Sequence, residues 1–264
     1  MKKIISKQNE TIKRIKSLEK KKYREKYSEI LLEGYRLIED AADSVLIIKT
    51  VLYVESVDKK KAILVERLSE SGTEAIEADE EVFEYISDTV NSQGILAIAK
   101  MPSNEFEDIP QKPQGFMIYL DCMQDPGNLG TVIRTADAAG AECVAISSGS
   151  VDAYNAKVLR SAMGSVFHLP VIQKVPGKQF IEDLKRGGYR IIAADLKGAR
   201  EYREMDYGEK VCLVIGNEGS GIRDEILDIC DESVKIPIIG RAESLNASVA
   251  AGILLYDIAM KRNC

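Results

Sequence analysis

Residues 236–256 read IPIIGRAESLNASVAAGILLY, and this stretch decides the fold expected for the C-terminal half of the chain. An apolar run, 236–239, ends at Gly240 and a short polar loop follows it. Ser244 is expected to cap a long buried helix, because its hydroxyl can accept from the free N–H groups of the first turn. Small residues from Ala247 to Gly252 would let another backbone approach this helix closely. Taken alone, the stretch fits a strand–helix unit that closes a sheet as well as a loop that holds a ligand.

Upstream of this stretch, short apolar runs alternate with helical patterns. Strands are expected at 116–120, 142–147, 166–171, 189–194, 210–215 and 233–238, and helices at about 127–139, 154–162, 178–186 and 221–229. Strands with almost no polar residues, separated by helices, indicate a mainly parallel sheet covered on both faces. Such sheets bind ligands beyond the C-terminal ends of their strands.

The first hundred residues show a second α/β pattern. We expect a basic helix over 8–27, strands over 28–32, 45–54 and 95–99, and helices over 35–43, 58–69 and 79–87. Residues 101–114 hold three of the seven prolines and no periodicity, which predicts a linker. We therefore predict two domains, 1–105 and 106–264, and a chain of 264 residues is long enough for both to have a core.

The composition excludes several classes of protein. With 45% hydrophobic and 30% charged residues, the chain is typical of soluble globular proteins. It has no apolar run near the roughly 18 residues of a membrane span and no signal-peptide pattern, so we expect a cytoplasmic protein without membrane contact. Five scattered cysteines and a single histidine argue against a metal site. The histidine, His168, falls in the expected strand 166–171, where a structural role is favoured over that of a general base.

Charge is distributed unevenly along the chain. Residues 1–26 contain eleven lysines and arginines against three glutamates, a net charge of +8, so within a total of −6 the remainder carries −14. A basic segment on an acidic protein suggests that one end meets a polyanion. A solvated helix face would give the same pattern.

Three loops beyond expected strand ends hold the polar residues that could carry chemistry. In the first, a turn at 125–127 leads to Asn128 and, six residues on, to Arg134, which helical phase places on different faces. Arg134 could instead pair with a carboxylate. The second loop, 216–221, is a glycine turn that presents Glu218, and it lacks the Gly-Lys-Ser/Thr of a phosphate loop. The third holds Ser244 and Asn246.

Three motifs in this order resemble those of the SpoU/TrmH class of SPOUT RNA 2′-O-ribose methyltransferases. They are DPGNLGTVIRTADAAG (125–140), LVIGNEGSGI (213–222) and the stretch 236–256, and the intervening DAYNAKVLRSAMGSVFHLPV (152–171) is also similar. SKQNETIKRIKSL (6–18) and LLEGYRLIEDA (31–41) resemble the substrate-binding domain of ribosomal RNA members. The resemblance implies a C-terminal SPOUT-type α/β domain with a deep trefoil knot, preceded by a small L30e-like α/β domain.

The resemblance also implies a cofactor, S-adenosylmethionine, and the residues that bind it. These are Gly216, Asn217, Ile236, Ile238, Gly240, Leu245 and Asn246. The central catalytic role falls to Arg134, with Asn128, Glu218, Ser244 and Asn246 orienting it and the nucleotide. Arginine does not give up its proton and is a poor base. Our hypothesis is that Arg134 orients the ribose hydroxyl and neutralises charge, while Glu218 or an RNA phosphate accepts the proton; no metal is needed.

The implied partners are RNA and a second copy of the chain. RNA contacts are expected from Lys13, Arg14, Lys20, Arg24 and Arg160, and a homodimer is expected through the C-terminal helix. Arg160 could instead form a surface ion pair. The favoured function is methylation of large-subunit (23S) ribosomal RNA. The alternatives are a transfer RNA 2′-O-methyltransferase, a non-catalytic RNA-binding or ribosome-assembly factor of the same fold, and a nucleotide-binding protein that uses the Gly216 loop.

Overall fold

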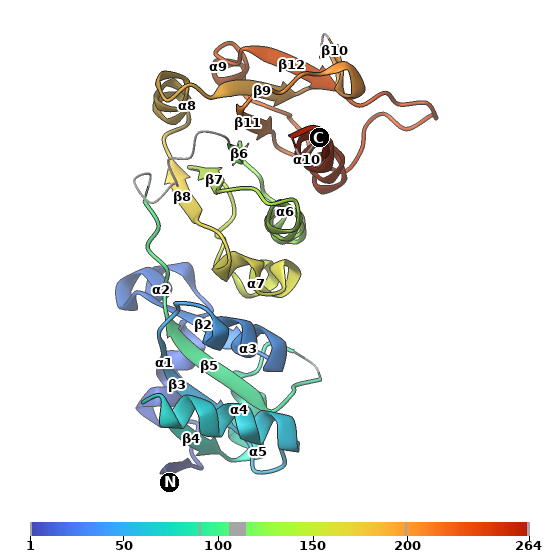
Figure 1. The fold of residues 1–264 in the computed structure, drawn as a ribbon. Helices are drawn as coiled ribbons and strands as arrows, with labels where there is room; N and C mark the ends of the chain where they lie inside the picture. Colours follow the sequence, from blue (N-terminus) through green and yellow to red (C-terminus); the bar gives the residue numbers. More distant parts are fainter. Residues whose placement is uncertain (1, 90, 106–114, 199, 263–264) are drawn as a thin grey trace. The chain divides into compact units, whose positions relative to one another are not determined.

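The computed structural model describes residues 2–89, 91–105, 115–198 and 200–262, and most of the predicted linker therefore lies outside the described residues. The chain divides into two compact units (Figure 1). Unit 1 comprises Met1–Pro102 with Tyr154–Phe167, and unit 2 comprises Ser103–Ala153 with His168–Cys264. None of the helices in the described ranges is long and apolar enough to cross a membrane.

Unit 2 is built on a seven-stranded sheet. Its strands are β6 (Gly115–Leu120), β7 (Val144–Ser147), β8 (Val171–Val175), β9 (Arg190–Ala194), β10 (Arg200–Glu201), β11 (Lys210–Ile215) and β12 (Glu232–Lys235). Their order is β10-β12-β9-β11-β6-β7-β8, and all six pairings are parallel. The predicted mainly parallel sheet is confirmed. The central strands β6, β7 and β11 are apolar on both faces because helices cover both.

The helices of unit 2 divide between the two faces of the sheet (Figure 1). They are α6 (Pro126–Ala138), α8 (Gly177–Arg186), α9 (Asp224–Leu227) and α10 (Ala247–Arg262), with a 3-10 turn η3 (Tyr202–Glu204). On one face Phe180 and Ile226, from α8 and α9, join a buried cluster with Tyr119 of β6. On the other face α10 packs against α6 and β11. The trefoil knot does not follow from strand order and stays a prediction.

Unit 1 has a mixed five-stranded sheet. Its strands are β1 (Lys2–Ile4), β2 (Glu29–Glu33), β3 (Ile48–Tyr53), β4 (Glu74–Ala78) and β5 (Ile95–Lys100), in the order β1-β4-β3-β5-β2, and β5 runs antiparallel to both neighbours. Its helices are α1 (Glu10–Ser17), α2 (Lys21–Tyr27), α3 (Tyr35–Asp43), α4 (Lys59–Glu70), α5 (Glu80–Ile86) and α7 (Ala156–Ala162), with a 3-10 turn η2 (Ser165–Phe167). The predicted α/β class is confirmed, but β1 and β4 were not predicted.

The single basic helix predicted over 8–27 is wrong, because the segment forms two helices. α1 ends at Ser17 and α2 starts at Lys21. The buried Arg24 of α2 donates from Nη1 to the carbonyl oxygens of Leu18 (2.7 Å) and Glu19 (2.8 Å). This contact satisfies carbonyl groups that a continuous helix would have bonded internally, so it stabilises the break.

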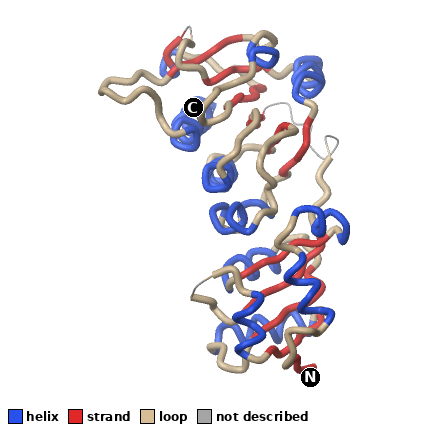
Figure 2. Tube along the Cα trace, turned by 180° about the vertical axis from the view of Figure 1, so that it is seen from behind, coloured by secondary structure: helices blue, strands red, loops and turns tan. Residues whose placement is uncertain are grey.

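Two predicted strands also begin or end elsewhere. The segment 166–171 consists of the end of a 3-10 turn, a turn at His168 and a bend at Leu169, and β8 starts only at Val171. Pro170, directly before it, has no N–H to donate to a neighbouring strand, and His168 therefore does not lie in a strand. β12 ends at Lys235 rather than at 238. The chain then runs in a long exposed loop to α10, with Ile239 98% exposed (Figure 2).

Candidate active site

The C-terminal ends of β9, β11 and β12 surround a cavity of about 460 Å³ in unit 2. Residues within four segments line it: 194–197, 215–224, 234–238 and 244–254. Parallel strands present such ligand sites at this edge. The cavity therefore joins the loops after β9 and β11 to the connection that leads from β12 into α10.

The glycine loop, residues 216–223, forms one wall of this cavity. Asn217 and Gly221 exchange backbone hydrogen bonds of 2.9 and 3.0 Å, and the Asn217 Oδ1 accepts from the N–H groups of Gly219 (2.8 Å) and Ser220 (3.0 Å). A Cβ atom on Gly216 would lie 2.2 Å from the carbonyl carbon of Gly221. Only glycine fits there, so the wall is fixed by backbone geometry.

The Glu218 carboxylate connects the glycine loop to the start of α6. Its oxygens accept from the backbone N–H groups of Gln124 (3.1 Å) and Asp125 (3.0 Å) and from Nδ2 of Asn128 (3.1 Å). Burial raises the pKa of Glu218, but the hydrogen bonds from Asp125, Asn128 and Gln124 outweigh it, and the pKa is lowered below its ordinary value. Glu218 is thus held ionised as an acceptor.

Asn128 also contacts Asn246, the residue directly before α10. Its Oδ1 accepts from Nδ2 of Asn246 at 3.0 Å. The Asn246 Oδ1 accepts from the backbone N–H (2.8 Å) and hydroxyl (2.6 Å) of Ser248, at the first turn of α10. The predicted cap is therefore wrong: Asn246, not Ser244, caps the helix. Glu218, Asn128 and Asn246 form one chain of hydrogen bonds across the three motif loops.

The structure brings together most, but not all, of the predicted catalytic residues. Ser244 lines the cavity next to the glycine loop. Arg134 lies on the exposed side of α6, is absent from the cavity lining, and makes no hydrogen bond or ion pair with the residues the structure describes. Its alternative role, pairing with a carboxylate, is not seen among those residues. Its guanidinium is free to meet a substrate.

Some of the predicted cofactor-binding residues line the cavity and others do not. Gly216, Asn217, Ile236, Ile238 and Leu245 all line the cavity, whereas Gly240 and Asn246 do not. Apolar side chains opposite a backbone-walled loop suit a purine nucleoside, which needs a stacking surface and close polar backbone groups. The residues present therefore fit S-adenosylmethionine.

Sequence reasoning missed one segment of the lining. Asp195, Leu196 and Lys197 follow β9 and border the cavity. The Asp195 Oδ1 accepts from the N–H of Lys197 at 3.1 Å, which folds this connection into a tight turn. The signal was available, because a polar residue directly after a buried strand marks the ligand edge of a parallel sheet.

The predicted RNA-binding residues differ in whether their side chains are exposed and in whether they already have a partner within the protein. Lys20 is exposed, and Lys13 is exposed with an ion pair to Glu10. The Arg14 guanidinium binds the buried carboxylate of Glu29 at 2.7 and 2.8 Å. Arg24 is only 4% exposed and serves the backbone of the α1–α2 turn, so a phosphate contact does not fit its position. Arg160 donates to Asp88 at 2.8 Å, the ion pair expected as its alternative.

The single histidine has a structural partner. His168 Nδ1 lies 2.8 Å from Oδ2 of Asp137 on α6. Within the described ranges there is no group of three or more His, Cys, Asp or Glu side chains that could hold a metal ion.

Two family models match the chain. The SpoU rRNA Methylase family model matches residues 115–256, and the MRM3-like substrate binding domain model matches residues 9–97. The chain is 37% identical over 259 residues to the 23S rRNA (guanosine(2553)-2′-O)-methyltransferase RlmP of Bacillus subtilis, an alignment that covers 98% of this chain and 99% of that protein.

Solved structures agree over nearly the whole chain. The AdoMet-bound rRNA methyltransferase from Sinorhizobium meliloti superposes with a TM-score of 0.90 at 32% identity, covering 100% of this chain and 98% of the other. The SpoU methyltransferase AviRb from Streptomyces viridochromogenes, in complex with AdoMet, gives 0.89 at 28% identity and covers 97% and 99%. The similarity thus spans both units.

Proposed function

The chain belongs to the SpoU rRNA methylase family and is an S-adenosylmethionine-dependent RNA 2′-O-ribose methyltransferase, and we propose that its substrate is large-subunit ribosomal RNA. The near-complete match to a relative named for guanosine 2553 of 23S rRNA supports the corresponding guanosine as the target. A match to a substrate-binding domain model over residues 9–97 supports unit 1 as the part that binds this RNA. We also propose a cytoplasmic location for the reaction.

One observation carries this proposal. The chain Glu218–Asn128–Asn246 joins the three motif loops beside a cavity whose walls suit the cofactor. Each amide is oriented by its partners: Asn128 donates to Glu218 and accepts from Asn246, so neither side chain can flip without losing a contact. This fixed polar edge holds a ribose next to the cofactor cavity and limits the orientations in which its hydroxyl can react.

The chemistry asks little of the protein beyond positioning. Bound S-adenosylmethionine supplies an activated methyl group, so the protein has to orient a 2′-hydroxyl and receive its proton. The hydroxyl proton becomes acidic as the oxygen is alkylated, so a weak acceptor suffices. Glu218 is such an acceptor, since three N–H donors hold it ionised. Arg134, on the exposed side of α6, contacts the ribose hydroxyl or the adjacent phosphate and stabilises negative charge there.

The substrate is tested by mapping 2′-O-methyl groups in ribosomal and transfer RNA from cells with and without the gene. We expect one guanosine of 23S rRNA to lose its methyl group in the deletion. Loss of methylation only in transfer RNA would establish the alternative substrate. Unchanged methylation in both RNAs, together with no S-adenosylmethionine binding in calorimetry, would establish a non-catalytic RNA-binding factor.

Arg134→Lys tests the assigned catalytic role. We expect turnover to fall by roughly a hundredfold, because a lysine cannot reproduce the planar pair of donors, while cofactor affinity in calorimetry stays unchanged. Wild-type turnover in this variant would remove Arg134 from the mechanism.

We also propose a homodimer that packs through α10. Three large apolar side chains, Val249, Tyr256 and Met260, are 51%, 46% and 64% exposed. Their spacing places them on one face of the helix, opposite the buried Leu255 and Ile258. This exposed stripe suits a self-complementary contact with a second copy of the chain.

A further inference from the structure

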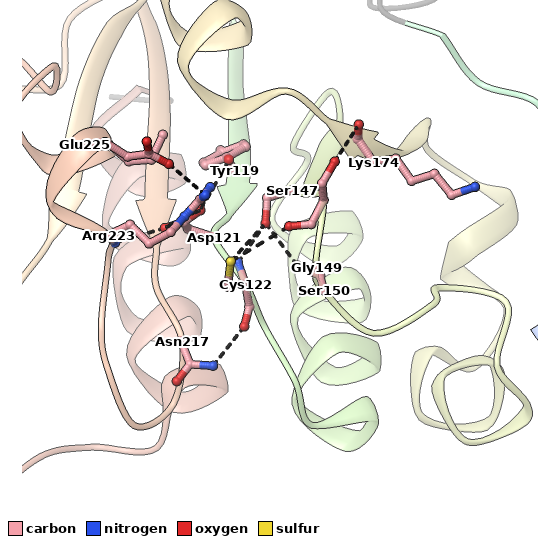
Figure 3. Close-up of polar contacts among 12 residues, drawn as sticks. Tyr119, Asp121, Cys122, Ser147, Gly149, Ser150, Lys174, Asn217, Arg223 and Glu225 are labelled. Carbon is pink, nitrogen blue, oxygen red and sulfur yellow. Dashed lines mark hydrogen bonds and ion pairs between the residues drawn. The ribbon is translucent and has the colours of Figure 1, made fainter.

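The glycine loop ends in an arginine that turns away from the cavity. Ile222 and Asp224 both line the cavity, but Arg223 between them does not. Its side chain lies against Asp121, the residue that directly follows β6, and against Glu225 (Figure 3). The loop therefore faces the cofactor cavity with its inner side and is held from its outer side.

Asp121 is built for this contact. Its side chain is completely buried, and both of its oxygens are used. Oδ2 accepts from the backbone N–H of Arg223 at 3.0 Å, and Oδ1 accepts from Nη2 at 2.7 Å and from Nε at 3.0 Å. Tyr119 Oη donates to Oδ1 at 3.4 Å. One carboxylate thus fixes both the backbone and the side chain of Arg223.

The next residue holds the other end of the loop. The carbonyl oxygen of Cys122 accepts from Nδ2 of Asn217 at 2.8 Å (Figure 3). Cys122 adopts the left-handed backbone conformation, with φ of 56°, which directs the chain from β6 towards α6. Asp121 therefore binds the glycine loop at Arg223, and Cys122 binds it at Asn217. These two contacts lie at opposite ends of the turn that lines the cavity.

Two of the groups in this contact, Arg223 and Tyr119, have raised pKa values. The hydrogen bond to Asp121 raises the pKa of Arg223, and burial followed by the nearby Asp121 charge raises the pKa of Tyr119. Arg223 therefore stays cationic and Tyr119 neutral over the whole working range of pH.

We propose that Asp121 and Arg223 are positioning residues that hold the glycine loop in the conformation that binds S-adenosylmethionine. The inference rests on the proposed function, since it names the residues that shape the cofactor cavity. The reacting edge is held by other contacts, those of Glu218 with Gln124, Asp125 and Asn128. Loss of the Asp121–Arg223 pair therefore acts on cofactor affinity and leaves the chemical step nearly unchanged.

Asp121→Asn is the first test. It replaces one acceptor oxygen of Asp121 by an NH2 group, which is itself a donor and cannot accept a hydrogen bond from Arg223. We expect the KM and the Kd for S-adenosylmethionine to rise by roughly tenfold or more, as for loss of one charged hydrogen bond, with kcat within about twofold of wild type. Arg223→Lys keeps the charge but only one donor direction, and should give an intermediate KM.

A second variant separates positioning from stability. Asp121→Leu/Arg223→Leu replaces the buried Asp121 and the partly exposed Arg223 by apolar side chains, so that no buried charge is left without its partner. If the pair served only stability, this double variant would bind the cofactor like wild type. We expect it to fold, as judged by its unfolding midpoint, and still to show the raised KM.

The control is Lys185→Gln, which removes the 2.7 Å ion pair to Asp231 elsewhere in unit 2 and should leave KM and kcat unchanged. An unchanged cofactor KM in the double variant, or a loss of kcat at constant KM in Asp121→Asn, would overturn the inference. A wild-type protein that binds no S-adenosylmethionine would instead overturn the proposed function.

Discussion

The Asn246 side chain has two tasks at the residue scale. Its Oδ1 caps α10 through the N–H of Ser248, while its Nδ2 donates to Asn128. The first task contributes to stability and the second to the geometry of the active site. Because different atoms perform them, substitutions can separate the two.

Asn246→Ala should lose both tasks. We expect the free energy of unfolding to fall by about 1 kcal/mol, the usual cost of a lost N-cap, and turnover to fall as well. Asn246→Asp keeps the capping oxygen and adds a favourable charge at the helix start, but it offers Asn128 no amide donor. Its stability in urea unfolding should match wild type while its turnover stays low. Recovery of turnover in the Asp variant would contradict the role given to the Asn246–Asn128 contact.

Glu218 gives a pH dependence with a definite sign. Because its pKa in the folded protein lies below the ordinary value of 4.5, its stabilising contribution is complete above that pH and is lost as the pH falls through the folded pKa. Between pH 7 and 5, wild type should exceed Glu218→Gln in free energy of unfolding by a constant amount of at most about 1 kcal/mol, because Glu218 is exposed and solvent screens its contacts. Below about pH 4.5 the two should converge. Urea titrations at stepped pH measure this, and a difference that grows on acidification would refute it.

At the scale of elements, the sequence predicts best where burial decides. The strands at 116–120 and 210–215 are apolar on both faces and appear where expected, as does the helix 35–43. The strand β4 (EAIEA) is short, has glutamates at its first and fourth positions and lacks strict alternation, so its pattern does not separate it from a loop. The break between α1 and α2 depends on Arg24 reaching back to the α1 carbonyls, a tertiary contact that periodicity does not contain.

The candidate site shows the same limit. A helix start containing both Ser244 and Asn246 offers two good caps, and the choice between them is made with Asn128, which is 118 residues away in sequence. The Glu218–Asn128 contact spans 90 residues. Neither distance can be derived from local patterns. The grouping of these residues was predicted from the family resemblance, whereas the hydrogen bonds that join them come from the fold.

Helix α10 carries the prediction on assembly. Tyr256→Glu/Met260→Glu places charges on its exposed apolar face, where a dimer contact would bury them at high cost. We expect this variant to sediment as a monomer with an unchanged unfolding midpoint for the isolated chain, and wild type to sediment as a dimer. Analytical ultracentrifugation measures both. A wild-type monomer at working concentrations would remove the proposed interface.

On the scale of the whole molecule, the basic N-terminal segment both builds a core and presents charge. Ile12, Ile15 and Leu18 are buried in unit 1, whereas Lys20 and Lys22 are exposed, and Lys22 lies 4.7 Å from the centre of the Tyr23 ring. Deleting the segment would remove core side chains together with charges. Its RNA contacts are therefore better tested by neutralising exposed lysines.

Lys20→Gln/Lys22→Gln should weaken RNA binding and flatten its salt dependence. Each phosphate contact that is lost lowers the slope of log K against log salt by about 0.7–0.9. The matched control is Lys59→Gln/Lys60→Gln, which removes two exposed lysines from α4 of the same unit. Binding of a 23S rRNA fragment at several salt concentrations compares the two. Equal slopes for both double variants would show that α2 makes no specific contribution.

The strand order of unit 2 has a consequence for how the protein is made. β6 has β11 as a neighbour, with Gly115 opposite Lys210, so the centre of the sheet joins segments that leave the ribosome far apart in time. Until β11 has been translated, one edge of the apolar β6 has no partner. Strand pairs between segments distant in sequence form slowly, and the intermediates that precede them expose apolar surface and are prone to aggregate. Nascent chains of this enzyme should therefore depend on chaperones until β11, Lys210–Ile215 of the 264 residues, has been translated.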